Sequence, residues 1–217
     1  MAQVTRQFTG LRPERIRDNL ERVRENIAAA GRDPAGVEIL AAIKYVPAEE
    51  LGTLAEGGIE LVGENRAQEL LAKRERHAGD FTWDFIGALQ SRKVKDVAPN
   101  VRLIHSVASE SALGQLEKHP AKEVLIEVNV AGEGSKAGID PADLKRYLDG
   151  CPVPVTGLMC MPPFTENAED SRPYFARIAE LAAEHGLPRL SMGTSQDYTV
   201  AVQEGATIVR LGSVLYE

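Results

Sequence analysis

The chain has 217 residues, 43% of them hydrophobic and 26% charged, and a formal net charge of −7. A chain of this size can bury a substantial core, whereas its acidity argues against a general nucleic-acid binder, which needs clustered lysine and arginine. It contains no run of about 18 apolar residues that would span a membrane, and its N-terminus lacks the apolar region of a secretory signal. The two cysteines and four histidines have no metal-ligand spacing, so we expect a cytoplasmic protein without a metal site.

The first predicted element is an amphipathic helix over residues 13–30. Apolar side chains recur there at helical spacing, at Ile16, Leu20, Val23 and Ile27. Pro13 lies in the first turn of this segment and Gly31 follows its last residue. Both residue types are common at these two ends of a helix, so the segment has a helical start and a helical stop.

Strands and helices alternate through the rest of the chain. Eight apolar runs predict strands at 37–43, 59–62, 83–86, 101–107, 124–130, 155–160, 189–192 and 207–211. Between them, helical patterns occur at 48–56, 65–76, 91–97, 109–118, 141–148, 169–185 and 196–204. This alternation is typical of parallel βαβ units, so the sequence indicates an α/β fold.

The number of these units favours a closed (β/α)8 TIM barrel, although an open doubly wound sheet has the same alternation. Only residues 212–217 follow the eighth predicted strand, too few for an outer helix. The extra N-terminal helix at 13–30 can occupy the vacant place and cover the seam of the barrel. No linker rich in serine, proline or glycine divides the chain, so we expect a single domain over residues 1–217.

Lys44 is the first candidate for chemistry. It ends the apolar run at 37–43, and Pro47 follows three residues later. Barrels of this kind carry their active sites at the carboxyl ends of the strands, and a lysine amine in that position can attack a carbonyl group. The alternative is that Lys44 only extends into solvent, as most lysines at strand ends do.

The turns after the last two strands are candidates for binding phosphate. Barrels often bind phosphate in these loops through backbone N–H groups. The seventh strand runs into Gly193, Thr194 and Ser195, and the eighth into Gly212 and Ser213. Glycine lets the backbone approach an anion, and serine adds a hydroxyl donor. Each turn also has a structural explanation, because Ser195 can be a helix N-cap and Gly212 a simple turn residue.

An amine and a phosphate site at one end of a barrel predict a phosphorylated carbonyl compound as ligand. It is either a sugar phosphate held as a Schiff base or pyridoxal 5'-phosphate. Arg210, inside the eighth strand, bears on this choice. A buried arginine needs a partner, which is either a carboxylate such as Glu127 or the pyridine nitrogen of pyridoxal phosphate.

A series of motifs across nearly the whole chain resembles the pyridoxal phosphate homeostasis protein family (YggS/PROSC), whose barrel is similar to the N-terminal domain of bacterial alanine racemase. The series begins with Ala-Ile-Lys at 42–44 and Gly-Glu-Asn-Arg-Ala-Gln-Glu at 63–69. Further motifs lie at 83–93, 104–107, 135–138, 157–159, 190–195 and 209–213. They occur in the order and spacing of the family, which makes the series specific although no single motif is.

The resemblance implies a role for each candidate site residue. Lys44 would hold pyridoxal 5'-phosphate as a Schiff base, and Arg210 would face its pyridine nitrogen. Asn65 would lie near the cofactor ring, and Met192 would either lie against the cofactor or pack the barrel. The phosphate would be bound by Ser195, Gly212 and Ser213.

Several residues depart from the family or have simpler explanations. The family usually has histidine at the position of Asp84 and asparagine at that of Arg92. These departures put any role of the loop after the third strand in doubt, and they leave cofactor binding untouched. We expect His105 to be a hydrogen-bonded structural residue, and Glu64 and Arg66 to form an ion pair.

The resemblance favours a cofactor-binding protein that buffers or delivers pyridoxal phosphate in vitamin B6 homeostasis, with apo-enzymes as recipients, and it implies a monomer. Lys136 is a second amine at the same end of the barrel. Alanine racemase also places an arginine at the pyridine nitrogen, but it adds a second domain and a partner's tyrosine, for which the five tyrosines here include no obvious equivalent. The alternatives are a weak amino-acid racemase that uses pyridoxal phosphate and a Schiff-base aldolase for sugar phosphates.

Overall fold

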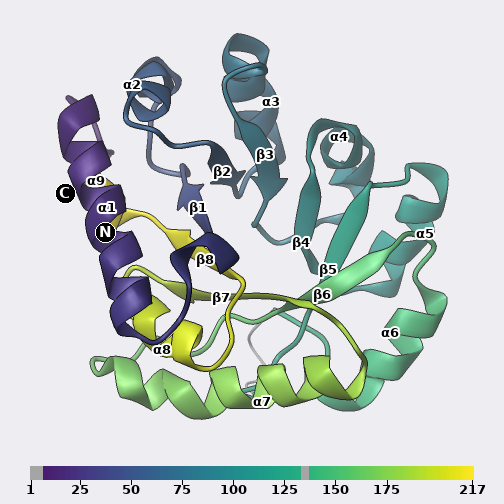
Figure 1. The fold of residues 1–217 in the computed structure, drawn as a ribbon. Coiled ribbons are helices and arrows are strands. Elements are labelled where there is room, and N and C mark those ends of the chain that lie inside the picture. The colour runs from purple at the N-terminus through teal and green to yellow at the C-terminus, as the bar shows by residue number, and fades with distance from the viewer. Residues whose placement is uncertain (1–6, 133–136) are drawn as a thin grey trace, which may run out of the picture.

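The strands close into a barrel. The computed structural model describes residues 7–132 and 137–217, and the strands form one closed parallel sheet in the order β1 to β8, with β8 paired to β1 (Figure 1). The strands are β1 (Glu38–Ala42), β2 (Leu61–Glu64), β3 (Thr82–Phe85), β4 (Leu103–Val107), β5 (Glu123–Glu127), β6 (Val155–Met159), β7 (Arg189–Thr194) and β8 (Ile208–Leu211). The predicted (β/α)8 barrel is confirmed.

Helices surround the barrel and include the predicted N-terminal one. They are α1 (Pro13–Ala29), α2 (Leu51–Glu56), α3 (Ala67–His77), α4 (Val94–Val97), α5 (Glu110–Lys118), α6 (Leu144–Gly150), α7 (Arg172–Glu184), α8 (Tyr198–Gln203) and α9 (Ser213–Tyr216). Helix α1 packs against α2, α8 and α9 and so covers the seam between the last and first strands (Figure 1). The Asn19 amide fixes it there by donating to the Leu215 carbonyl, at 3.1 Å.

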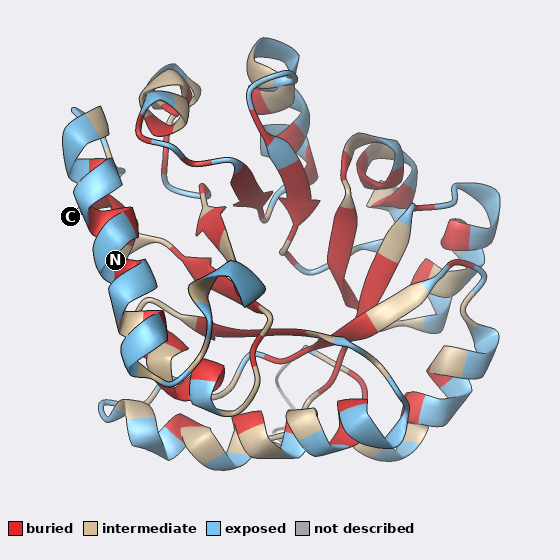
Figure 2. Cartoon of the chain, in the orientation of Figure 1, coloured by how far each residue is buried: buried red, intermediate tan, exposed pale blue. Residues whose placement is uncertain are grey.

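Alternation along the strands separates two apolar layers, because successive side chains point to opposite faces of the sheet. The inner layer fills the barrel with Leu40, Leu61, Leu103, Leu125, Met159 and Ile208. The outer layer lies between the strands and the helices and includes the apolar side of α1. Figure 2 shows the strands buried and the outward sides of the helices exposed. The fold therefore has a packed barrel interior and no open pore.

Several segments differ from the sequence-based expectations, among them the strand expected at 124–130, which is β5 at Glu123–Glu127. Strand β2 begins at Leu61 and continues to Glu64, because this is the stretch that pairs with β3. The segment 91–97 is a 3-10 turn (Ser91–Lys93) followed by the short helix α4. The C-terminal residues, expected to be too few for an outer helix, form a single helical turn, α9. The assignment of residues 1–217 to a single domain stays a prediction. None of the described helices is long and apolar enough to cross a membrane.

Gly157 and Gly114 offer a matched test of barrel packing. A Cβ at Gly157, on β6, would overlap the carbonyl oxygen of Arg189 on β7, whereas a Cβ at Gly114, on the exposed side of α5, meets nothing within 4 Å. We expect Gly157→Ala to lower the free energy of unfolding by about 1–3 kcal/mol through overpacking. Gly114→Ala should raise it by about 0.5–1 kcal/mol, because alanine is the better helix former. Urea unfolding of both variants measures this; an unaffected Gly157→Ala would contradict the strand contact.

Candidate functional site

Six of the seven residues predicted to bind the cofactor line one cavity. This cavity, of about 490 Å³, opens at the carboxyl ends of the strands and is lined by Phe8, Ala42, Lys44, Tyr45, Asn65, Ile86, Gly87, Met161, Phe164, Thr194, Ser195, Gln196, Arg210, Gly212 and Ser213. It contains every residue proposed from the sequence to bind the cofactor except Met192. Segments that are far apart in the chain converge here because all eight strands are parallel.

Lys44 lies just after β1 and is exposed at the cavity mouth. Its ammonium nitrogen lies 4.7 Å from the centre of the Tyr45 ring, close enough for a cation–π contact. The backbone before it is fixed, since Ile43 is fully buried and its N–H donates to the carbonyl of Gly63 at 3.0 Å. The amine therefore extends from a rigid strand end into a space that a ligand can enter.

The turns after β7 and β8 form a cluster of donors. The hydroxyl oxygen of Ser195 accepts the Gly212 N–H at 3.0 Å and the Val214 N–H at 3.5 Å. Gly193 adopts a φ of 90°, which favours glycine, but it lies inside β7, and the turn comes after it at residues 195–197. Asp197 stabilises the turn by accepting from the N–H and hydroxyl of Thr194, at 2.7 and 3.0 Å.

Gly212 leaves room for an anion close to the backbone. A Cβ at this position would have only the Ala42 carbonyl oxygen near it, at 3.9 Å, so the side-chain position of Gly212 opens toward the cavity it lines. Ser213 begins the turn of α9 beside it and also lines the cavity. Backbone N–H groups and two serine hydroxyls thus face the same space, which is a donor set that suits a phosphate.

Arg210 is buried, with 4% of its surface exposed, and its guanidinium reaches the cavity from inside the barrel. One terminal nitrogen donates to the carbonyl and hydroxyl oxygens of Ser191, both at 2.7 Å, and the other to the carbonyl of Cys160 at 2.9 Å. Glu127, the alternative partner, forms no ion pair with Arg210 among the described contacts. Burial raises the pKa of the Glu127 carboxyl, and the charge of Arg210 only partly opposes this.

A hydrogen-bonded chain continues from Ser191 through the barrel interior. The Ser191 hydroxyl lies 2.8 Å from Nδ1 of His105, and Nε2 of His105 lies 3.1 Å from Asp84. Asp84 also accepts two hydrogen bonds from Arg102, at 3.0 and 2.7 Å. His105 is therefore hydrogen-bonded at both ring nitrogens, as expected. The sequence showed Asp84 only as a departure from the family, and its contacts follow from the register of β3 and β4.

The expected ion pair between Glu64 and Arg66 is wrong. Glu64 is fully buried and pairs with Lys73 of α3, whose ammonium nitrogen lies 2.6 Å from its carboxylate, while Arg66 is exposed. Glu64 instead accepts the N–H of Arg66 and that of Asn65, the latter at 2.7 Å. Lys73 also donates to the carbonyl of Ile43 at 2.8 Å. One buried pair thus ties Asn65 to the residue that precedes Lys44.

Lys73 was missed from the sequence although a signal was present. It follows Ala67 and Leu70 at a spacing of three residues on the buried side of α3. A lysine at such a position requires a buried acidic partner, since charged residues are almost never fully buried unpaired. Glu64 was the nearest acidic residue at a strand end. Helical periodicity and a strand-end carboxylate together predict this pair.

Met192, Arg92 and Lys136 lie away from the cavity or outside the described part of the chain. Met192 is fully buried in the layer between the strands and the helices, so it packs the barrel, which is the other role considered for it. Arg92 is exposed and donates to the side chain of Gln90 at 3.0 Å. Lys136 falls in the segment 133–136, which the structure does not describe.

The chain matches the family model of the alanine racemase N-terminal domain over residues 12–217. It is 42% identical to the pyridoxal phosphate homeostasis protein of Aquifex aeolicus, covering 94% of this chain and 96% of that protein. The protein of the same name from Pseudomonas aeruginosa is 37% identical, with 94% of each chain covered. The chain belongs to the pyridoxal phosphate homeostasis protein family.

Solved structures agree with this family. The structure of PipY from Synechococcus elongatus without pyridoxal phosphate is 31% identical and has a TM-score of 0.82, covering 93% of this chain and all of that one. A second PipY structure, with pyridoxal phosphate bound, has a TM-score of 0.79. Alanine racemase from Corynebacterium glutamicum is 15% identical, with a TM-score of 0.68 over 61% of its length, and shares the fold alone.

Replacing Lys73 tests the buried pair beside the site. We expect Lys73→Met to lower the free energy of unfolding by about 3–5 kcal/mol, because it leaves the carboxylate of Glu64 buried without its partner. Arg76→Met is the matched control on the same helix, since its pair with Glu49 is exposed, and it should leave the unfolding curve unchanged. Urea unfolding followed by circular dichroism gives both values. Equal curves for the two variants would show that Glu64 does not depend on Lys73.

Proposed function

We propose that this protein binds pyridoxal 5'-phosphate reversibly through Lys44 and buffers or delivers the cofactor in the cytoplasm, without catalysing a reaction of its own. The observation that carries the proposal is the single cavity that joins an exposed lysine amine, a cluster of anion donors and a buried arginine. The relatives support it, because they are named pyridoxal phosphate homeostasis proteins and a PipY structure holds pyridoxal phosphate.

The residues present fit this cofactor. The N–H groups of Gly212 and Val214 donate to the hydroxyl oxygen of Ser195, so a phosphate oxygen would replace that hydroxyl as their acceptor, and Ser213 would add a hydroxyl donor. Arg210 would face the pyridine nitrogen. Asn65 would lie near the ring. Its backbone packs directly against Gly87, where a Cβ would overlap it, and this contact holds it in place.

Lys44 supplies the covalent link. When bound, pyridoxal phosphate offers an aldehyde that condenses with a lysine amine to a Schiff base, with the loss of one water, and the addition of water reverses the reaction. Since Lys44 is exposed at the cavity mouth, water and a competing amine can reach this link. Exposure of that kind suits loading and release of the cofactor.

Arg210 weakens the case for catalysis. Enzymes that form carbanions on pyridoxal phosphate benefit from a protonated pyridine nitrogen, and a permanently cationic guanidinium facing that nitrogen disfavours the proton. Tyr216, near the cavity, is no ready base either. Burial raises the pKa of its phenol, as does the charge of Glu64, and its hydroxyl donates to the carbonyl of Ala42 at 3.3 Å.

One observation favours a weak amino-acid racemase as the second candidate. Tyr45 lines the same cavity as Lys44, and its ring lies directly beside the ammonium group. A phenol there could exchange a proton with a substrate held on the cofactor, which the sequence had not indicated.

The role of delivery also needs recipients, which we propose are apo-enzymes that use this cofactor, and a monomer leaves the cavity mouth free to meet them.

An absorbance titration with pyridoxal phosphate tests the binding proposal. The wild-type protein should develop the band near ~420 nm of a protonated aldimine, at longer wavelength than that of free pyridoxal phosphate, and Lys44→Ala should abolish it. Lys145→Ala is the control, since Lys145 is exposed on α6 and pairs with Asp149. A band that survives in Lys44→Ala would move the attachment to another amine, with Lys136 the first to replace. A colourless wild-type protein that borohydride traps with a sugar phosphate would instead support the aldolase.

Proton exchange separates a carrier from a racemase. Incubating the loaded protein with L-alanine in deuterium oxide should give α-proton exchange no faster than free pyridoxal phosphate at the same concentration. Nuclear magnetic resonance of the alanine α-proton measures the rate. Exchange well above this background, lost in Tyr45→Phe with cofactor binding intact, would overturn the non-catalytic role and identify Tyr45 as the base.

A further inference from the structure

Arg210 lies at one end of a buried chain of side chains that crosses the barrel interior. The chain runs from Arg102 to Asp84, His105, Ser191 and Arg210, with hydrogen-bond distances of 2.7 to 3.1 Å along it. Its members come from β3, β4, β7 and β8 and from the residue that precedes β4. Asp84 and His105 are fully buried and Ser191 is as well. Nothing in the proposed function uses Asp84, His105 or Ser191.

The chain has one consistent direction. Asp84 is ionised, because hydrogen bonds from His105 and Arg102 outweigh burial and hold its pKa below the usual range, so it only accepts. His105 must then donate from Nε2. Burial lowers the pKa of His105 more than the hydrogen bond and charge of Asp84 raise it, and the charges of Arg210 and Arg102 lower it further. We therefore take the ring as neutral, with Nδ1 accepting the Ser191 hydroxyl proton. The oxygen of Ser191 is left to accept from Arg210.

Ser191 is the principal partner of the Arg210 guanidinium. It supplies both oxygens that bond one terminal nitrogen, while the Cys160 carbonyl bonds the other. None of the described carboxylates forms an ion pair with Arg210, although the group is 4% exposed. Its position therefore depends on neutral acceptors, and the orientation of one of them, the Ser191 hydroxyl, is set by His105.

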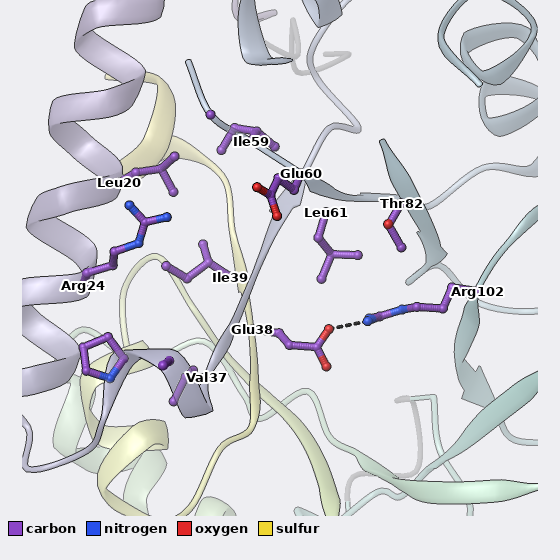
Figure 3. Close-up of a pocket in the computed structure, with 13 residues that line it drawn as sticks. Leu20, Arg24, Val37, Glu38, Ile39, Ile59, Glu60, Leu61, Thr82 and Arg102 are labelled. Carbon is purple, nitrogen blue, oxygen red and sulfur yellow. Dashed lines mark hydrogen bonds and ion pairs between the residues drawn. The ribbon is translucent and has the colours of Figure 1, made fainter. Parts of the chain in front are cut away.

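The other end of the chain is anchored at the opposite mouth of the barrel. Arg102 pairs with Glu38 at the start of β1, beside a second cavity of about 370 Å³ (Figure 3). Arg102 thus has two carboxylate partners, Glu38 and Asp84, so the charge of Asp84 is compensated from outside. Because Arg102 compensates its charge, the Asp84 carboxylate does not require a protonated His105 as a counter-ion.

We propose that Asp84 and His105 are positioning residues that act through Ser191 to hold the guanidinium of Arg210 toward the cofactor cavity. The inference rests on the proposed function, since it assigns these residues to the pyridine side of that site. It gives a role to Asp84, the position at which this protein departs from the usual histidine of the family. The simpler alternative is that the chain only fills the barrel interior with satisfied polar groups.

The first test uses the cofactor-free protein, and its decisive measurement is made on the wild type. Nitrogen-15 nuclear magnetic resonance of the histidine side chains should show His105 neutral between about pH 5.5 and 8.5, with its proton on Nε2. In Asp84→Asn the amide can donate to Nε2, so the tautomer should reverse to Nδ1–H. A protonated His105, or an Nδ1–H ring in the wild type, would overturn the inference whatever the protein binds.

The second test measures affinity for pyridoxal phosphate by the absorbance titration. Asp84→Asn and Ser191→Ala should each weaken binding about tenfold, as loss of a hydrogen bond to a charged group does. Because Asp84 acts through Ser191, the double variant should bind no more weakly than Ser191→Ala alone. Glu123→Gln is the control and should not change the affinity. Glu123 pairs with Arg189 on the neighbouring part of the sheet, and neither residue belongs to the hydrogen-bonded chain.

The outcomes separate the inference from the proposed function. Losses that multiply in the double variant, or single variants that lower the unfolding temperature while binding the cofactor as tightly as the wild type, would reduce the chain to a structural role. A wild-type protein that binds no pyridoxal phosphate would overturn the proposed function instead. In that case the tautomer of His105 still decides whether the chain runs as described.

Discussion

The burial of a permanent positive charge inside the barrel is the constraint on which the carboxyl end of this structure depends. Arginine cannot lose its proton in a protein, so the guanidinium of Arg210 must find acceptors where it lies. It finds them in Ser191 on β7 and in the carbonyl that follows β6. A leucine in place of Ser191 would be compatible with a packed barrel but not with this arginine. The polar acceptors around Arg210 are thus a requirement of one buried charge.

The barrel interior holds two kinds of side chain at overlapping heights. An apolar group of leucine, isoleucine and methionine side chains fills much of the space. Beside it, the polar group formed by Asp84, His105, Ser191 and Arg210 crosses the interior, and the strand register pairs Leu40 with Arg210 and Met159 with Ser191. The apolar part accounts for the stability of a closed sheet. The polar part costs stability, because buried charges are expensive even when paired.

Much of this arrangement could be predicted from the sequence because topology determines it. Once eight parallel strands are recognised, residues such as Lys44, Ser195 and Gly212 must lie at the same end, since each follows a strand. Side-chain direction was harder. Met192 and Ser191 are adjacent in sequence, yet one faces the helices and the other the barrel interior. A strand whose two faces are both buried shows no alternation of polarity to set the register.

The missed contacts have a common cause as well. The pair of Glu64 with Lys73 and the contacts of Asp84 join residues on different elements, and the partner of each is fixed by packing and not by local pattern. A charged residue in a buried stripe tells the reader that a partner exists but not which one it is. Lys73 could have been found by pairing helical periodicity with the nearest strand-end carboxylate. Arg102 lies inside the strand expected at 101–107, but the structure places it just before β4, and its partners follow from packing alone.

The two charged groups that face the cofactor cavity differ in how firmly they are held. Arg210 is enclosed and bonded through both terminal nitrogens, whereas Lys44 is exposed and contacts only the ring of Tyr45 in the described structure. A site that fixes one cation and leaves the other, the proposed nucleophile, accessible would orient a ligand without sealing it in. Catalysts on this cofactor instead gain from excluding water around the reacting bond. The division between a rigid floor and an open mouth therefore suits a protein whose ligand must leave as readily as it binds.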